Sequence, residues 1–262
     1  MFRSDPIRLE TTLRSLARAI VRAREAGVLG ATSVWLIDNG NELALLARGQ
    51  NAFAHAGVRL ELRHGHGNVG YGRGHNIALL AETAEFRLVL NPDVELEENA
   101  LAHAIAFLRE HPRVGLLAPD VRNEKGEREY LCKRYPALAD LLLRGFAPAW
   151  LRRRFAPRLA QYEMRDLIGD DVVEGIPIAS GAFMLVRGEA ALRTGGFDPQ
   201  FFLYFEDFDW SLRLGAIMTN AYVPSVRIVH HGGQAARKGP DHIAMFVAGA
   251  LRFYRKHGWR LR

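Results

Sequence analysis

The chain is poor in cysteine, with Cys132 the only one among 262 residues. A single cysteine cannot form an internal disulfide, which excludes a small secreted protein held together by disulfides and favours a reducing setting. No apolar run is long enough to span a bilayer. Residues 1–6 lack the hydrophobic region of a signal peptide, and internal repeats and low-complexity segments are also lacking. These absences predict a cytoplasmic globular protein.

Arginine accounts for most of the formal net charge of +6. Two segments, residues 144–158 and 252–262, mix arginine with aromatic residues and leucine. Such a mixture suits a surface that rests on anionic lipid headgroups, although solvated helix faces with long arginine stems are at least as common. No nucleic-acid motif is found and the charge does not form one basic stripe, which disfavours nucleic-acid binding.

Strands and helices alternate in the first part of the chain. Short apolar runs bounded by turn residues predict buried strands, and apolar residues at a spacing of three and four predict helices. The expected strands are 33–37, 58–62, 86–90 and 114–119, the last closed by its proline, and the expected helices are 9–26, 76–84 and 97–110. This order predicts an α/β fold with an open, mixed but mainly parallel sheet flanked by helices.

The second part of the chain begins with a segment that loses this alternation. Residues 131–171 are rich in leucine and arginine and predict a helical insertion, after which residues 178–186 resume the character of a strand. A further strand is expected at 226–229. We expect a single domain over residues 1–262, divided into a nucleotide-binding half (1–120), the helical insertion (131–171), an acceptor and catalytic half (172–240) and a basic C-terminal helix (241–262).

Two polar clusters follow predicted strands or precede helices in the first half. Asp38-Asn39-Gly40 follows the strand 33–37, where the aspartate can accept hydrogen bonds from a nucleoside, but the same sequence is common in simple turns. Residues 68–76 form a glycine-rich loop before a predicted helix and resemble a phosphate-binding loop. They have neither the Walker lysine pattern nor the dinucleotide spacing, so a loop shaped by turn geometry alone stays open.

Candidate metal ligands lie at two further strand ends. Asn91-Pro92-Asp93 follows the strand 86–90, and a carboxylate in this position can coordinate a divalent cation that bridges phosphates. A turn or helix-capping role for Asp93 is the alternative. His230 and His231 follow the strand 226–229. Because adjacent side chains of a strand point to opposite faces, we expect only one of them to be a ligand.

Three carboxylates, Glu206, Asp207 and Asp209, occur in the aromatic and aliphatic run of residues 201–210. Ionised carboxylates avoid apolar surroundings unless a cation, hydrogen bonds or a raised pKa offsets their lost hydration. A general base or a metal site would explain them. A carboxylate network that caps a helix beginning near Glu206 is the alternative.

Taken in order, these motifs resemble the inverting family-two glycosyltransferases of the GT-A fold, and most closely their rhamnosyltransferase-like branch. Each motif alone is weak, but the ordered set is specific and spans roughly residues 38–231. The motifs that carry the resemblance are Asp38-Asn39-Gly40, the loop 68–76, residues 90–94, 180–184, 195–198 and 201–209, Arg213, and His230-His231.

The resemblance implies a nucleotide-sugar donor bound over the sheet. It assigns donor contacts to Asp38, Asn39, Asn68, Gly70, Tyr71, Gly74, Asn76, Asn91 and Arg213. Asp93 corresponds to the last aspartate of the family's metal-binding motif and would hold Mg²⁺ or Mn²⁺, with His230 as the first and His231 as the second choice for a further ligand. Asn91 replaces the first aspartate of that motif.

The resemblance also implies that Asp207 is the base that deprotonates the acceptor hydroxyl. Apolar neighbours would raise the pKa of Asp207, and like-charge repulsion from Glu206 and Asp209 would add to this. Glu206 or Asp209 could instead orient the acceptor or pair with Arg213.

The function implied is metal-dependent, inverting transfer of a sugar, with rhamnose from dTDP-rhamnose as the candidate donor. The implied acceptor is a polysaccharide or a polyprenyl-linked lipid, and the implied location is the cytoplasmic face of the plasma membrane. The alternative is a catalytically inactive module that binds a nucleotide or a glycan. It is favoured by an expected lack of the family's usual first strand. Gly233 stands near the place where the family often has a serine or threonine that contacts the donor, and Arg237 and Lys238 could supply charge to the diphosphate instead.

Overall fold

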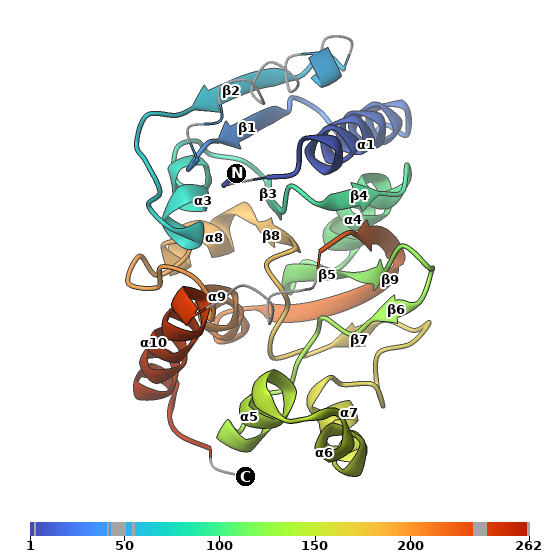
Figure 1. Cartoon of the computed structure of the whole chain (residues 1–262). Coiled ribbons are helices and arrows are strands. Elements are labelled where there is room, and N and C mark those ends of the chain that lie inside the picture. The colour runs from blue at the N-terminus through green and yellow to red at the C-terminus, as the bar shows by residue number, and fades with distance from the viewer. Residues whose placement is uncertain (3, 41, 43–50, 54–55, 233–239, 261–262) are drawn as a thin grey trace.

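The computed structural model describes residues 1–262 apart from 3, 41, 43–50, 54–55, 233–239 and 261–262. A seven-stranded mixed sheet forms the centre of the molecule, with helices on both faces (Figure 1). Its main path is β3 (Phe86–Leu90), β8 (Phe183–Arg187), β5 (Val114–Arg122), β9 (Thr219–His230) and β4 (Val94–Leu96), while β6 (Arg128–Glu129) pairs with β5 and β7 (Val173–Glu174) with β9.

A separate two-stranded sheet is formed by β1 (Ser33–Ile37) and β2 (Arg59–Arg63), which pair in parallel. The mixed sheet agrees with the prediction, but parallel pairing does not predominate. Among the described strands, the pairs β1–β2 and β5–β9 are parallel, whereas β8 runs antiparallel to both β3 and β5, and β4, β6 and β7 also pair antiparallel to their neighbours. A strand that is buried on both faces is a continuous apolar run whichever way its neighbours run, so the apolar runs did not predict these directions.

Two predicted boundaries move for local reasons. Helix α1 (Pro6–Glu25) begins before the expected residue 9, because the Asp5 carboxylate accepts hydrogen bonds from the amides of Ile7 and Arg8 at 2.9 and 3.0 Å. Strand β5 continues through Pro119 and does not end there. The proline is tolerated at an irregularity, where the register between β5 and β9 shifts after Pro119.

Helix α3 (Tyr71–Leu79) replaces the helix expected at 76–84, so most of the glycine-rich segment is helical. Of the predicted strand 178–186, only the part from Phe183 onward is β8, while Ile178 forms an isolated bridge with Lys133 and residues 181–182 form a turn. The expected C-terminal helix is α10 (Pro240–His257). Further helices are α4 (Ala100–Glu110), α5 (Leu138–Phe146), α6 (Ala149–Arg154), α7 (Ala156–Tyr162), α8 (Gly188–Thr194) and α9 (Glu206–Gly215), and α5 to α7 lie within residues 131–171.

Three groups of buried side chains hold these elements together. One packs α1 and α4 on the sheet, and a second packs α8 and α9 against it. The third is aromatic and joins α10 and α5 to the segment before α9, with Phe201, Phe205, Leu141, Tyr162, Phe253 and Tyr254 as its buried members. Two elements therefore hold the start of α9 in place: helix α5 of the insertion and the C-terminal helix α10.

Candidate active site

The acidic pair Glu206 and Asp207 forms the first turn of α9, as the alternative reading of a helix start at Glu206 also expected. Tyr204 and Phe205, just before it, both have left-handed backbone conformations, with φ of 72° and 67°. Such conformations are strained for residues other than glycine and occur mostly at functional sites. The aromatic cluster on Phe205 provides the packing that holds this strained turn in place.

Asp207 is anchored by backbone amides. Its Oδ2 accepts a hydrogen bond of 2.9 Å from the Gly181 amide, and its Oδ1 accepts one of 2.9 Å from the Phe208 amide. Gly181 lies in the turn just before β8, so this contact joins α9 to the sheet. Burial raises the pKa of Asp207, while the amide hydrogen bonds oppose that rise.

Glu206 is buried more deeply, with 4% of its surface exposed. Its Oε2 has no hydrogen-bond partner within the described part of the chain. Burial, and then the neighbouring charge of Asp207, raise the pKa of Glu206 to about 8. Because Asp207 accepts two amide hydrogen bonds and Glu206 Oε2 accepts none, we place the proton of the pair on Glu206 at neutral pH.

The Tyr71 hydroxyl connects this pair to the end of β3. It lies 2.7 Å from the Gly181 carbonyl oxygen and 3.1 Å from Asn91 Oδ1. Burial raises the pKa of Tyr71 well above its usual value, and the charge of Asp207 adds to this. Three predicted site residues, Tyr71, Asn91 and Asp207, are thus brought together around Gly181.

Asp209 does not act on Asp207 in the way that the sequence suggested. It is fully buried, and its carboxylate lies 2.8 Å from Arg213 Nε, 2.7 Å from Lys256 Nζ and 2.8 Å from His257 Nε2. The Arg213 and Lys256 cations compensate its charge, and repulsion from Asp209 is not among the causes that raise the pKa of Asp207. The alternative pairing with Arg213 is the one that the structure shows.

Arg213 and Asn76 are hydrogen-bonded to the protein's own backbone, and their contact with a donor stays a prediction. The remaining Arg213 nitrogens donate to the carbonyl oxygens of Thr194 and Gly196, at 2.6 and 2.7 Å. Asn76 makes a pair of hydrogen bonds with Phe197, donating to its carbonyl at 2.7 Å and accepting from its amide at 2.9 Å. These contacts give both side chains a structural role within the fold.

The glycines of residues 68–76 let α3 approach other parts of the chain. A Cβ atom on Gly70 would lie 2.5 Å from the Phe202 carbonyl oxygen, and one on Gly74 would lie 2.9 Å from Asn39 Nδ2. Gly70 also has a φ of 89°, and its amide donates to Asn68 Oδ1 at 3.1 Å. These contacts explain the glycines by packing, while their role beside a nucleotide stays a prediction.

Asp38 and Asn39 lie in a closed turn after β1. The carboxylate of Asp38 is buried and accepts from the amides of Gly40 and Glu42, at 2.9 and 2.6 Å. Asn39 donates to the Gly70 carbonyl at 3.0 Å and lies 2.9 Å from His66 Nε2. The turn links β1 to α3, and its contact with a nucleoside stays a prediction.

Asp93 and His230 form the candidate metal site. Asp93 Oδ1 is buried without a hydrogen-bond partner in the described structure and lies 3.7 Å from His230 Nε2. On the other side of the ring, His230 Nδ1 lies 3.2 Å from Glu129 Oε2. An ionised Glu129 would accept a hydrogen bond from the Nδ1–H group of His230. Nε2 would then carry a lone pair on the side of Asp93, which is the arrangement common for metal-binding histidines.

His231 has other carboxylate neighbours. Its Nδ1 lies 3.0 Å from Glu124 Oε1 and its Nε2 lies 3.5 Å from Glu95 Oε2, and its role as a second-choice ligand stays a prediction. Among the residues described, no three His, Cys, Asp or Glu side chains gather as a complete metal site. Asp93 and His230 still fit Mg²⁺ or Mn²⁺, which often takes few protein ligands and completes its shell with substrate phosphates and water.

Glu129 and Gly181 were not identified from the sequence. Glu129 lies in a two-residue strand, 101 positions before its partner His230, and no local pattern marks it. Gly181 lies within a motif of the resemblance, but nothing in its type indicates that its amide binds Asp207. Both follow only from tertiary contacts.

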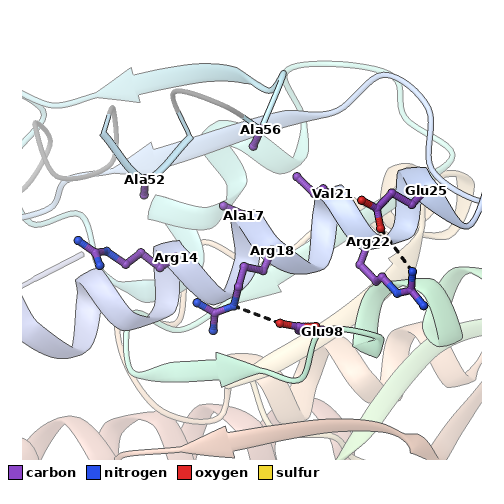
Figure 2. Close-up of a pocket in the computed structure, with 9 residues that line it drawn as sticks. All are labelled: Arg14, Ala17, Arg18, Val21, Arg22, Glu25, Ala52, Ala56 and Glu98. Atoms are coloured by element: carbon purple, nitrogen blue, oxygen red, sulfur yellow. Dashed lines mark hydrogen bonds and ion pairs between the residues drawn. The ribbon is translucent and has the colours of Figure 1, made fainter.

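A cavity of about 440 Å³ lies elsewhere, along α1 beside Ala52 and Ala56 (Figure 2). Arg14, Arg18 and Arg22 line it along one face of α1, and Arg18 and Arg22 pair with Glu98 and Glu25 at 3.8 and 3.3 Å. The cavity contains no member of the acidic pair or of the candidate metal site. We therefore place the chemistry at α9 and the end of β3.

No family model matches the chain, but the chain is similar in sequence to known rhamnosyltransferases. The chain is 31% identical over 212 residues to the N-acetylglucosaminyl-diphospho-decaprenol L-rhamnosyltransferase of Mycobacterium tuberculosis, which covers 73% of this chain and 66% of that protein. It is 27% identical over 203 residues to the rhamnosyltransferase WbbL of Escherichia coli K12, covering 74% and 70%. The chain thus spans just under two thirds of the mycobacterial relative's length.

Solved structures show the same fold at low sequence identity. The structure of GalNAc-T7 with UDP, GalNAc and Mn²⁺ matches with a TM-score of 0.58 and 15% identity, over 86% of this chain and 41% of that one. Residues 1–349 of Staphylococcus aureus TarS match with a TM-score of 0.52 and 13% identity, over 95% and 68%. The mannosyltransferase PcManGT of Pyrobaculum calidifontis, in complex with GDP-Man and Mn²⁺, matches with a TM-score of 0.50 and 18% identity, over 85% and 55%. The chain thus has the fold of these glycosyltransferases and is similar in sequence to rhamnosyltransferases.

Proposed function

We propose that the chain is an inverting glycosyltransferase that moves a sugar from a nucleotide-sugar donor onto a lipid-linked acceptor, with Asp207 as the general base. The observation that carries this proposal is the buried acidic pair at the start of α9, in which Asp207 is held by the Gly181 amide beside Tyr71 and Asn91. A carboxylate that is buried, fixed in direction and raised in pKa is suited to take up a proton.

In this mechanism Asp207 Oδ accepts the proton of the acceptor hydroxyl. The hydroxyl oxygen then forms a bond to the anomeric carbon as the bond from that carbon to the diphosphate oxygen breaks. The bonding electrons leave with the nucleoside diphosphate on the opposite face, which inverts the configuration. The amides of Gly181 and Phe208 hold Asp207 in direction, and a protonated Glu206 adds no second negative charge beside it.

Asp93 and His230 would hold the divalent cation, and Glu129 would orient His230. When bound, Mg²⁺ or Mn²⁺ offsets the negative charge that develops on the leaving diphosphate. The orphaned Asp93 Oδ1 supports this part of the proposal, because a buried carboxylate oxygen without a partner is costly unless a ligand completes it.

The donor and acceptor are proposed from the relatives. The mycobacterial relative's name specifies transfer of L-rhamnose to an N-acetylglucosaminyl-diphospho-decaprenol, and we propose a dTDP-rhamnose donor and a polyprenyl-linked acceptor for this chain. Such an acceptor would place the protein at the inner face of the plasma membrane, in polysaccharide biosynthesis. None of the helices in the described part of the chain has the length and apolar character needed to cross a bilayer.

A transfer assay tests the proposal. Purified protein is incubated with Mn²⁺ or Mg²⁺, a panel of nucleotide sugars and a polyprenyl-diphosphate N-acetylglucosamine acceptor, and products are identified by mass spectrometry. We expect transfer of rhamnose with inversion, lost in Asp207→Asn. Donor binding without transfer or hydrolysis under any of these conditions would contradict the proposal and favour the inactive nucleotide-binding module.

A further inference from the structure

None of the residues of helix α6 is buried, and only Leu151 is partly buried. Its Trp150 is 69% exposed, and Phe155, which follows the helix, is 40% exposed. A tryptophan in this position gains nothing from the protein's own core, and tryptophan is favoured where one side of its ring meets apolar material and the other meets water. The helix therefore presents a surface that something else covers.

The charges on α6 indicate what covers it. Arg152, Arg153 and Arg154 are exposed, and none forms an ion pair within the described structure. Their neighbours differ, because Arg144 and Arg158 pair with Glu163 and Asp140, at 3.5 and 2.5 Å. Three adjacent arginines without counter-charges are complementary to an anionic surface.

A second arginine-bearing segment meets the start of α5. The Leu138 amide donates to the Arg260 carbonyl at 2.8 Å, and the Tyr254 hydroxyl donates to the Pro136 carbonyl at 3.2 Å. Trp259 is half exposed and stacks on Tyr254 at 4.8 Å. Two basic, aromatic segments more than a hundred residues apart therefore adjoin α5, and both lie along the lower side of the molecule in Figure 1.

We propose that Trp150, Arg152, Arg153, Arg154, Phe155 and Trp259 form a basic aromatic face that docks the protein on an anionic lipid bilayer. The arginines contact lipid phosphates, and the aromatic rings enter the interface between headgroups and acyl chains. α5 connects this face to the site, because its Leu141 packs in the same cluster as Phe205, the residue before Glu206. The face would hold the start of α9 near the membrane, where a lipid-linked acceptor presents its sugar.

The biological role of this docking rests on the proposed function, but the docking itself does not, because it requires neither a bound donor nor turnover. The test is co-sedimentation of the full chain with vesicles of phosphatidylglycerol and phosphatidylcholine in equal parts, compared with vesicles of phosphatidylcholine alone. We expect binding to the anionic vesicles and little to the neutral ones. Failure of sugar transfer would leave this result unchanged, so the two proposals fail separately.

Three variants make the test specific. R152Q/R153Q/R154Q should bind anionic vesicles on the order of a hundredfold more weakly, because each arginine near such a surface contributes about fivefold. Trp150→Ala should bind about tenfold more weakly, through the loss of apolar burial. The matched control R14Q/R18Q/R22Q removes the same charge from α1, on the opposite side of Figure 1, and should bind almost as well as the wild type.

Several results would overturn the inference. No binding of the wild type to anionic vesicles would do so, as would an equal loss in the α1 control, which would show an effect of net charge alone. A loss in the arginine variant with none in Trp150→Ala would indicate a purely electrostatic contact with some other polyanion. Circular dichroism of each variant checks that these exposed substitutions leave the fold intact.

Discussion

The Gly181 amide donates a 2.9 Å hydrogen bond to Asp207 Oδ2, and this contact joins the turn before β8 to the first turn of α9. The same glycine accepts from the Tyr71 hydroxyl through its carbonyl, so one peptide segment fixes both groups. A Cβ on Gly181 would lie 2.8 Å from the Tyr71 hydroxyl oxygen, which explains why a glycine is needed here. The direction of the proposed base is set by the fold and does not depend on a bound donor.

Replacing Glu206 by glutamine should preserve transfer and change the dependence of stability on pH. The raised pKa of Glu206, about 8, means that the folded protein keeps a proton that the unfolded chain has lost above about pH 4.5. The folded state then binds more protons, so this group makes the free energy of unfolding fall as pH rises through that window, by up to about 1.4 kcal/mol per pH unit. In Glu206→Gln this slope should be absent, as urea unfolding at several pH values would show. Identical slopes in both proteins would contradict a protonated Glu206.

Removing either proposed metal ligand should weaken cation binding. Asp93→Ala and His230→Ala should each reduce Mn²⁺ affinity in the presence of a nucleoside diphosphate by at least about tenfold, measured by titration calorimetry. His231→Ala is the matched control, because His231 faces Glu124 and Glu95 and should leave the affinity unchanged. A larger loss in His231→Ala than in His230→Ala would reverse the assignment.

Glu129 should act through His230. Glu129→Ala removes the acceptor at 3.2 Å from His230 Nδ1, and we expect about 10- to 100-fold weaker Mn²⁺ binding, the range known for such orienting partners. Nitrogen NMR of the labelled histidine should show the Nδ1–H tautomer in the wild type and a mixture in the variant. Glu124→Ala, which removes the partner of His231, serves as the control. An unchanged tautomer would show that Glu129 does not position His230.

Arg213 should matter for stability and not for donor binding. Arg213→Ala removes a cation from the buried Asp209 and two hydrogen bonds to the carbonyls of Thr194 and Gly196. We expect the free energy of unfolding to fall by about 2 kcal/mol or more, with donor affinity unchanged for the protein that remains folded. Weaker donor binding without a loss of stability would restore the original assignment.

Much of the local structure could be predicted from the sequence, because buried strands are short apolar runs. Residues 33–37 and 86–90 are β1 and β3 to the residue. The predicted start of α3 was too late, because the glycines before residue 76 are typical of a loop. In the structure these glycines allow the helix to pack closely against Phe202 and Asn39. Strand direction and the contact of Glu129 with His230 depend on tertiary contacts that no local pattern contains, whereas Asp209 and Arg213 lie four residues apart on α9, a spacing at which their pairing could be expected.

The central claim is that Asp207 is the general base, and the most direct test is the transfer rate of Asp207→Asn. Asparagine keeps the size of the side chain and cannot accept the acceptor's proton, so we predict a fall in kcat of about 10²- to 10⁴-fold with donor affinity nearly unchanged. Asp198→Asn, at a carboxylate paired with Lys256 at 2.6 Å, is the control. Wild-type kcat in Asp207→Asn would contradict the account.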